Sequence, residues 1–275
     1  MGGSVRRLRL FAAVAAAGLA LAACSSTDDT VDKTTPPDVL FNTGLAQLEA
    51  GKTTSAVKSF EDVDRLHPYS ELAKKSILLQ AYSNFQKGAY TDAIQASKRF
   101  VTLYPSHKDA AYAQYLIGES YYAQIPDITR DQDITNKSLE AYGDVIKKYP
   151  DSPYAKDAQK KIDFARDQLA GKEMEVGRFY LSKKQYLAAI SRFRKVVSDY
   201  QTTRHVEEAL SRLVESYYAL GVVKEAQTAA AVLGHNFPDS QWYRDSYALL
   251  KSGGYEPEVA SGSWITKALG KINVI

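Results

Sequence analysis

Cys24 is the only cysteine in the chain, so it is the only thiol that can act as a nucleophile, bind a metal or carry a modification. Three arginines stand within residues 6–9, an apolar run follows over residues 10–23, and this run ends in small residues next to the cysteine. Basic, apolar and small-residue segments in this order are typical of an export signal. The apolar run is too short for a membrane-spanning helix, which needs about 20 residues.

The segment resembles the signals of bacterial lipoproteins, in which a Leu-Ala-Ala-Cys box such as residues 21–24 marks the cleavage site. The resemblance implies that residues 1–23 are a removed signal peptide. It also implies that Cys24 carries a diacylglycerol on its sulfur and an acyl chain on its new amine, with no other cofactor. Stable anchoring needs more than one chain, since each buried methylene contributes only about 0.8 kcal/mol. Ser25 replaces the aspartate that retains lipoproteins at the inner membrane, so we expect a lipid-anchored protein on the periplasmic face of the outer membrane. The alternative is an ordinary cleaved signal with a chance cysteine.

No other group of residues has the spacing of a catalytic or metal site. The GKTT segment at residues 51–54 has Ala46 where a phosphate-binding loop needs glycine, and it follows a predicted helix rather than a strand. Asp131 and Asp133 lack the downstream glycine and glutamate of a calcium loop. No two of the four histidines have metal-ligand spacing; they are His67, His107, His205 and His235. We therefore predict no catalytic residue, no metal ligand and no enzymatic activity.

The charge balance argues against a nucleic-acid partner. Removing residues 1–23 takes away three arginines and no acid, which leaves 32 basic residues against 32 acidic ones. A nucleic-acid-binding protein needs a basic surface that displaces counterions from the phosphates. With Cys24 acylated no disulfide can form, so folding has to depend on apolar packing.

The rest of the chain is an internal repeat of helix pairs. A small residue precedes a proline by 12 residues in three places, and two degenerate copies keep the spacing: Ala56 and Pro68, Ala93 and Pro105, Ala226 and Pro238, Ser138 and Pro150, and Ala189 and Gln201. Gly51, Gly88 and Gly221 stand five residues before the small residue, where they would end the first helix of the pair. The proline would end the second helix.

A further small residue lies midway along each expected first helix, where it lets the partner helix approach closely: Gly44, Ala81, Gly118 and Gly177. The pattern resembles the tetratricopeptide repeat, and it predicts an all-α, TPR-like solenoid of five helix-turn-helix repeats over residues 38–250. Residues 152–181 contain few helix breakers and indicate one long helix. We divide the chain into the signal peptide, a flexible tether, repeats 1–3, repeats 4–5 with the long linking helix, and a flexible tail: residues 1–23, 24–37, 38–152, 153–250 and 251–275. An alternative for the tail is one short amphipathic turn around Trp264 and Ile265 that contacts a partner.

A stack of helix pairs offers a concave surface to a polypeptide. In this repeat class the first helix of each pair faces the groove, and its register selects Phe41, Leu45, Tyr82, Phe85, Tyr112, Tyr115 and Tyr122. Aromatic side chains give large contact areas at low entropic cost, so these positions are candidates for binding an extended or aromatic-ended peptide. Packing in the repeat core is the alternative for each of them. Tyr121 and Tyr142 fall outside the register, and we expect them in the core.

With the lipoprotein signal and five repeats, the RDQD loop at residues 130–133 and the KYPDSPYAKDA junction at residues 148–158 resemble the BamD (ComL) family. That resemblance implies a non-enzymatic scaffold of the β-barrel assembly (BAM) machinery. Such a scaffold docks on a POTRA domain of BamA, holds accessory Bam lipoproteins and recognises the C-terminal signal of unfolded outer-membrane proteins. It also implies that Arg192 lies near BamA, with Arg194 beside it available for a carboxylate. Gln201 departs from the family pattern, which has a proline there. A generic TPR adaptor lipoprotein in envelope maintenance, cell division or pilus assembly is the alternative.

Overall fold

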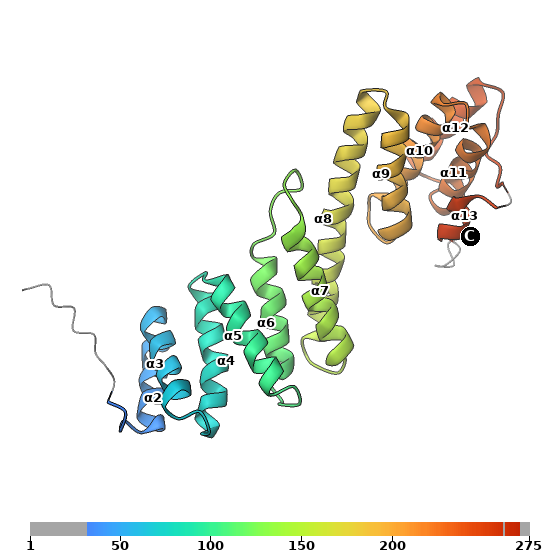
Figure 1. Cartoon of the computed structure of the whole chain (residues 1–275). Helices are drawn as coiled ribbons and strands as arrows, with labels where there is room; N and C mark the ends of the chain where they lie inside the picture. The colour runs from blue at the N-terminus through green and yellow to red at the C-terminus, as the bar shows by residue number, and fades with distance from the viewer. Residues whose placement is uncertain (1–31, 261, 270–275) are drawn as a thin grey trace, which may run out of the picture.

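The computed structural model describes residues 32–260 and 262–269, and every regular element in these ranges is a helix. Ten helices form five consecutive antiparallel pairs: α2 (Pro37–Glu49) with α3 (Thr53–Leu66), α4 (Glu71–Gln86) with α5 (Tyr90–Leu103), α6 (Ala110–Tyr122) with α7 (Asp133–Lys148), α8 (Ala155–Ser182) with α9 (Tyr186–Asp199), and α10 (Val206–Ala219) with α11 (Val223–Asn236). Each pair packs on the next, so the helices stack into an elongated array (Figure 1). The predicted all-α solenoid of five repeats is confirmed. Within the described ranges, none of the helices combines the length and apolar character needed to cross a bilayer.

The turns between paired helices use the predicted glycines. Gly51, Gly88 and Gly221 have φ angles of 71°, 77° and 76°, in the left-handed region that favours glycine. The GKTT segment is therefore a helix-helix turn, as its sequence context indicated. The fourth repeat has Lys184 at the same place, with a φ of 57°. A side chain in that conformation costs roughly 1–2 kcal/mol.

The small residues within the first helices allow close approach, as predicted. A Cβ added at Gly44 would lie 2.6 Å from the ring of Phe60, and one at Gly118 would lie 2.5 Å from the ring of Tyr142. Gly177 has the same relationship with the ring of Phe193. In each of these three pairs a fully buried aromatic ring of the second helix occupies the space that a side chain would fill.

The predicted long helix is α8, which continues through Gly171 to Ser182. Ala158 and Ile162 in its first half belong to the apolar cluster of the third repeat, around Tyr142. Ala170 and Met174 in its second half belong to the large cluster that fills the C-terminal repeats. The boundary expected after residue 152 thus falls just before a helix that both halves share (Figure 1).

The N-terminal tether prediction is only partly covered by the described residues. The signal peptide, Cys24 and residues 25–31 lie outside them. Residues 32–35 form a turn, α2 begins at Pro37, and the ring of His67 is hydrogen-bonded through Nε2 to the carbonyl of Thr35 at 2.8 Å. The last residues of the predicted tether are therefore held against the end of the first repeat.

The prediction of a flexible tail over residues 251–275 is wrong for the segment that forms helix α13. Helix α12 (Gln241–Ser252), which the repeat pattern did not distinguish, packs on α10 and α11. Helix α13 (Trp264–Leu269) returns to α9 and α11, and Ile265 is fully buried in the C-terminal cluster. The short helix around Trp264 and Ile265 corresponds to the alternative prediction for the tail, but it packs against its own chain. Apolar burial holds α13 in place, although its sequence lacks the periodicity of the repeats.

Candidate polypeptide-binding surface

Five of the seven predicted groove residues form one aromatic face across the N-terminal repeats. Tyr82 and Phe85 of α4 and Tyr112 of α6 pack together against Ala81 and Leu116. Tyr115 and Tyr122, also on α6, pack against the neighbouring cluster around Tyr142. We define the aromatic face as Tyr82, Phe85, Tyr112, Tyr115 and Tyr122, with the two α8-side residues described next.

Two residues that the sequence register did not select extend this face towards α8. Tyr154, at the N-cap of α8, stacks on Tyr115 with ring centres 5.1 Å apart, and it lies 5.5 Å from Tyr112. Phe164 lies 5.2 Å from Tyr122 and is 41% exposed. Both belong to the long helix, where the repeat register is interrupted. The tyrosine of the YPDSPY junction was the only signal for Tyr154.

Charged groups fix the α6 end of the face to α8. Glu119 accepts a 2.5 Å hydrogen bond from the Tyr142 hydroxyl and pairs with Lys161 at 3.3 Å. The Lys161 ammonium also lies 4.0 Å from the centre of the Tyr122 ring, at cation–π distance. This network orients Tyr122 on the surface.

Tyr112 and Tyr115 of the face keep their protons at physiological pH. Burial raises the pKa of Tyr112 to about 12. Burial and a hydrogen bond to Asp157 raise the pKa of Tyr115 further. The Tyr112 hydroxyl has no hydrogen-bond partner within the described part of the chain, and the Tyr82 hydroxyl accepts a bond from the Gln86 amide at 2.6 Å. Both hydroxyls can therefore donate to a backbone carbonyl of a ligand.

The predicted groove residues of α4 and α6 are neither fully exposed nor fully buried in the repeat core. The five residues of α4 and α6 are each partly exposed, so their rings support the repeat core and present an edge to solvent. Phe41 and Leu45 remain on α2, where Phe41 lies 5.8 Å from the Phe60 ring. The expectation for Tyr142 is confirmed, because it is fully buried, whereas Tyr121 is partly exposed on a different surface.

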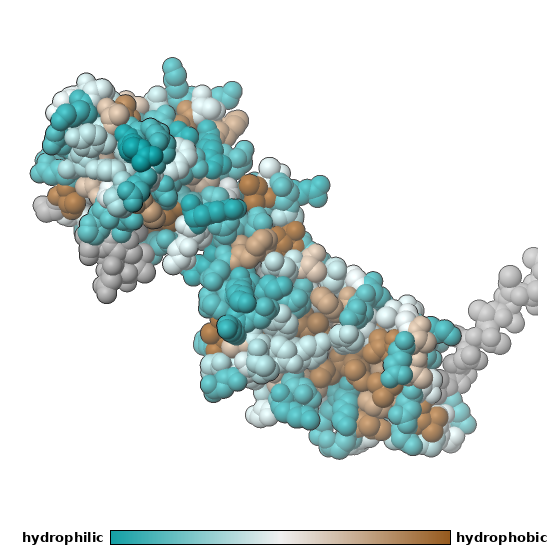
Figure 2. Space-filling view, turned by 180° about the vertical axis from the view of Figure 1, so that it is seen from behind, coloured by the Kyte–Doolittle hydropathy of each residue, from teal (hydrophilic) through white to brown (hydrophobic). Residues whose placement is uncertain are grey.

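On the face shown in Figure 2, hydrophobic surface is unevenly distributed between the halves. Seen from behind, it collects over the N-terminal repeats, whereas the C-terminal repeats present mainly hydrophilic residues (Figure 2). The N-terminal core is also divided into several small clusters, while one large cluster fills the C-terminal repeats. On this face the N-terminal half therefore presents more apolar surface to solvent than the C-terminal half.

Arg192 and Arg194, the residues expected to face BamA, both have partners within the chain. Arg192 pairs with Glu173 of α8 at 3.1 Å, and Lys195 pairs with the same carboxylate at 2.6 Å. The Arg194 guanidinium lies 4.4 Å from the centre of the Trp264 ring. A protein partner would have to add to these contacts or exchange them. Their role in docking stays a prediction.

Within the described ranges, no three histidine, acidic or cysteine side chains cluster closely enough to hold a metal ion. Stacked helix pairs with an aromatic face on their first helices define a repeat scaffold suited to binding other polypeptides. The chain belongs to the YfiO family, described as outer membrane lipoproteins, whose pattern matches residues 33–233.

Several relatives match most of this chain, and two of them share more than 40% of the aligned residues. It is 47% identical to outer membrane protein assembly factor BamD of Caulobacter vibrioides, over 82% of this chain and 73% of that protein. It is 43% identical to BamD of Rickettsia prowazekii, over 89% of this chain and 97% of that protein. Among solved structures, the yeast Sti1 TPR2AB-domain:pHSP90 complex aligns at 14% identity over 79% of this chain and 85% of that one, with a TM-score of 0.40.

Proposed function

We propose that this protein is a non-enzymatic scaffold that assists the assembly of outer-membrane β-barrel proteins. The observation that carries the proposal is its similarity, along most of the chain, to two proteins named as outer membrane protein assembly factors. Acyl chains on Cys24 would hold it at the periplasmic face of the outer membrane. The solenoid would then present unfolded barrel proteins to BamA and would hold accessory Bam lipoproteins.

The aromatic face is the part that would bind the unfolded substrate. An extended peptide with a terminal aromatic residue can place that ring among Tyr82, Phe85 and Tyr112, while the Tyr112 hydroxyl donates to its backbone. Half-buried rings give a preformed surface, so little side-chain entropy is lost on binding. The bound segment is held rather than transformed, and it remains free to move to the membrane-embedded partner.

The C-terminal repeats would supply the docking surface for the POTRA domain of BamA. Arg192 and Lys195 share one nearly buried carboxylate, so the cluster around Glu173 carries a net positive charge on α9. An acidic partner can complement that charge. Such exposed pairs contribute under about 1 kcal/mol each, so the docking would depend on several contacts.

The test is binding of a labelled peptide that ends in phenylalanine, taken from an outer-membrane barrel protein. Tyr82→Ala combined with Tyr112→Ala should weaken binding tenfold or more. Tyr69→Ala is the matched control, because Tyr69 is completely exposed and lies outside the aromatic face. Recovery of a POTRA-containing protein from detergent-solubilised outer membranes should be the same for all variants. Unchanged peptide affinity in the double variant would overturn the role of the face, and recovery of a different single partner would favour a generic envelope adaptor.

A further inference from the structure

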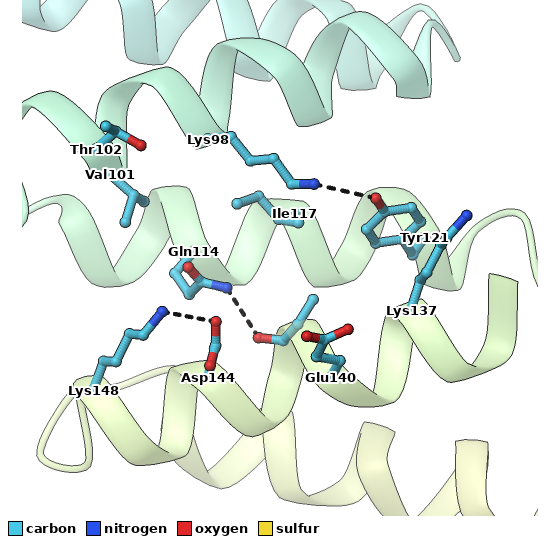
Figure 3. A pocket seen from close by; sticks show the side chains of 11 residues that line it. Lys98, Val101, Thr102, Gln114, Ile117, Tyr121, Lys137, Glu140, Asp144 and Lys148 are labelled. Atoms are coloured by element: carbon cyan, nitrogen blue, oxygen red, sulfur yellow. Dashed lines mark hydrogen bonds and ion pairs between the residues drawn. The ribbon is translucent and has the colours of Figure 1, made fainter. Parts of the chain in front are cut away.

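A second surface lies between α5, α6 and α7 and shares no residue with the aromatic face. A pocket of about 400 Å³ opens between α5, α6 and α7 (Figure 3). Ile117 and Ala141 form part of its apolar lining, and Lys98, Lys137 and Glu140 stand around it. The Lys98 ammonium reaches the Tyr121 hydroxyl at 3.5 Å, and no carboxylate pairs with Lys98 within the described part of the chain.

The C-terminal half repeats this arrangement in register. Helices α5 and α9 start at Tyr90 and Tyr186, 96 residues apart, and the GESYY segment of α6 (residues 118–122) recurs 96 residues later as VESYY in α10. Helices α7 and α11, the second helices of the third and fifth repeats, align with an offset of 88 residues, so that Ser138 corresponds to Ala226. The groove between α9, α10 and α11 is therefore the counterpart of the pocket.

In the C-terminal half this groove is filled, because α13 lies in it. The Trp264 indole N–H donates to the Tyr217 hydroxyl at 3.0 Å, and Arg194 covers the ring. The Ser263 hydroxyl donates to Glu225 at 2.7 Å. The three residues that contact α13 here have counterparts in the pocket of the N-terminal half. By the offsets given above, Tyr217 corresponds to Tyr121, Arg194 to Lys98 and Glu225 to Lys137.

Equivalent residues of the two grooves differ slightly in burial. Val197, Leu213 and Ala229 are fully buried in the C-terminal groove. Their counterpart Val101 is partly exposed, and the counterparts Ile117 and Ala141, which line the pocket, are 4% and 6% exposed. The N-terminal groove therefore keeps an apolar floor of the kind that α13 covers in the other half.

We propose that the pocket between α5, α6 and α7 binds a short amphipathic helix of a partner protein, in the way that its C-terminal counterpart binds α13. An aromatic residue in the first turn of that helix would lie on Tyr121 beneath Lys98. This site is separate from the aromatic face and goes beyond the proposed function.

The charges of the pocket specify the partner segment further. In the filled groove Ser263, the residue just before Trp264, donates to Glu225. The pocket has Lys137 at the position of Glu225, so the partner helix would carry an acidic residue just before its aromatic residue. Lys137 now pairs with Asp133 at 2.6 Å, and the incoming acid would share this ammonium. In the filled groove Thr228 is hydrogen-bonded to the backbone of Glu258 and Ala260. The pocket has Glu140 at the position of Thr228, so the partner would carry a basic residue about four positions before its aromatic residue.

The test uses a labelled peptide with the sequence of residues 260–269, changed by Ala260→Arg and Ser263→Asp, and the full mature chain. We expect saturable binding that Lys98→Glu with Lys137→Glu weakens tenfold or more. Lys147→Glu is the control, since Lys147 is exposed on α7 and does not line the pocket. A peptide with Ser263→Lys instead should regain affinity for the Lys137→Glu variant.

Three results would overturn the proposal. The first is the absence of saturable binding, and the second is equal affinity for the pocket variant and the control. The third is loss of binding only when Arg194 or Tyr217 is changed, because this would mean that the peptide displaces α13. As a second measurement, a photo-crosslinker at Thr102, an exposed residue of the pocket, should capture a segment with the basic, acidic and aromatic spacing described. Capture of a second copy of this chain would also count against it. Neither experiment uses the aromatic face, so their failure leaves the proposed function untouched.

Discussion

The Tyr115 hydroxyl on α6 donates a 2.5 Å hydrogen bond to Asp157 in the first turn of α8, while its ring stacks on Tyr154. One side chain thus joins the third repeat to the long helix and contributes to the aromatic face. A substitution of Tyr115 can therefore affect both peptide binding and the stability of the fold, and a test needs a variant that changes only one of the two.

Tyr115→Phe keeps the ring and removes the donor. Because the Asp157 carboxylate then loses a partner, we expect the free energy of unfolding to fall by about 1 kcal/mol, measured by urea denaturation. Affinity for the phenylalanine-ended peptide should not change, whereas Tyr115→Ala should lower both. Weaker peptide binding at full stability would show that the hydroxyl contacts the ligand instead.

Gly177→Ala should destabilise the C-terminal half by about 1–3 kcal/mol, since the new methyl group would overlap the buried ring of Phe193. Gly143→Ala is the matched control on α7. No atom lies within 4 Å of its added Cβ, so it should stabilise by roughly 0.5–1 kcal/mol through helix propensity. Thermal unfolding followed by circular dichroism compares the two. Equal effects would mean that the helices do not approach as closely as described.

Lys184→Gly should stabilise the protein. The native φ of 57° is strained for lysine and relaxed for glycine, and the gain exceeds the added entropy of the unfolded chain by about 0.5–1 kcal/mol. Lys183→Gly, one residue earlier at a φ of −89°, should instead destabilise. Urea midpoints of the two variants give the comparison, and a loss of stability in both would contradict the left-handed turn.

Trp264→Ala should release α13 from its groove. It removes a large ring that contacts Arg194 and Tyr217, so we expect a loss of about 2 kcal/mol, less than for a completely buried tryptophan. Limited proteolysis should then cut within residues 253–260 much faster than in the parent. Lys267→Ala, an exposed change on the same helix, should leave the cleavage rate as it was. Unaltered proteolysis of the tryptophan variant would contradict the packing of this helix.

The Arg178–Glu208 pair predicts a pH dependence. Burial alone would raise the pKa of Glu208, but its hydrogen bonds with Arg178 at 2.9 and 2.6 Å, together with the charge and hydrogen bond of Arg212, outweigh burial and lower it. A lowered folded-state pKa contributes stability above the unfolded value near 4.5, and this is lost as the pH falls through the folded pKa. The stability advantage of the parent over Glu208→Gln should therefore shrink between pH 6 and pH 3. A constant difference across this range would exclude the linkage.

Much of the fold was predictable because the repeat requires particular residues at particular places. Gly51, Gly88 and Gly221 are needed by left-handed turns, and Gly44 and Gly118 by the closeness of an aromatic ring. The aromatic face was partly predictable for the same reason, since its α4 and α6 residues follow the helix register. Tyr154 and Phe164 could not be predicted as part of the face, because the long helix α8 interrupts that register.

The sequence by itself determined the helix pairs, their number and the long α8, because turn glycines, small residues and terminating prolines are local requirements of the backbone. Only the tertiary structure decided that the tail folds back, that Arg192 and Arg194 have internal partners, and that one inter-repeat groove is filled while its counterpart is open. Those features depend on which surfaces meet across long stretches of chain, such as Trp264 with Tyr217, and apolar burial between distant segments leaves no periodic pattern.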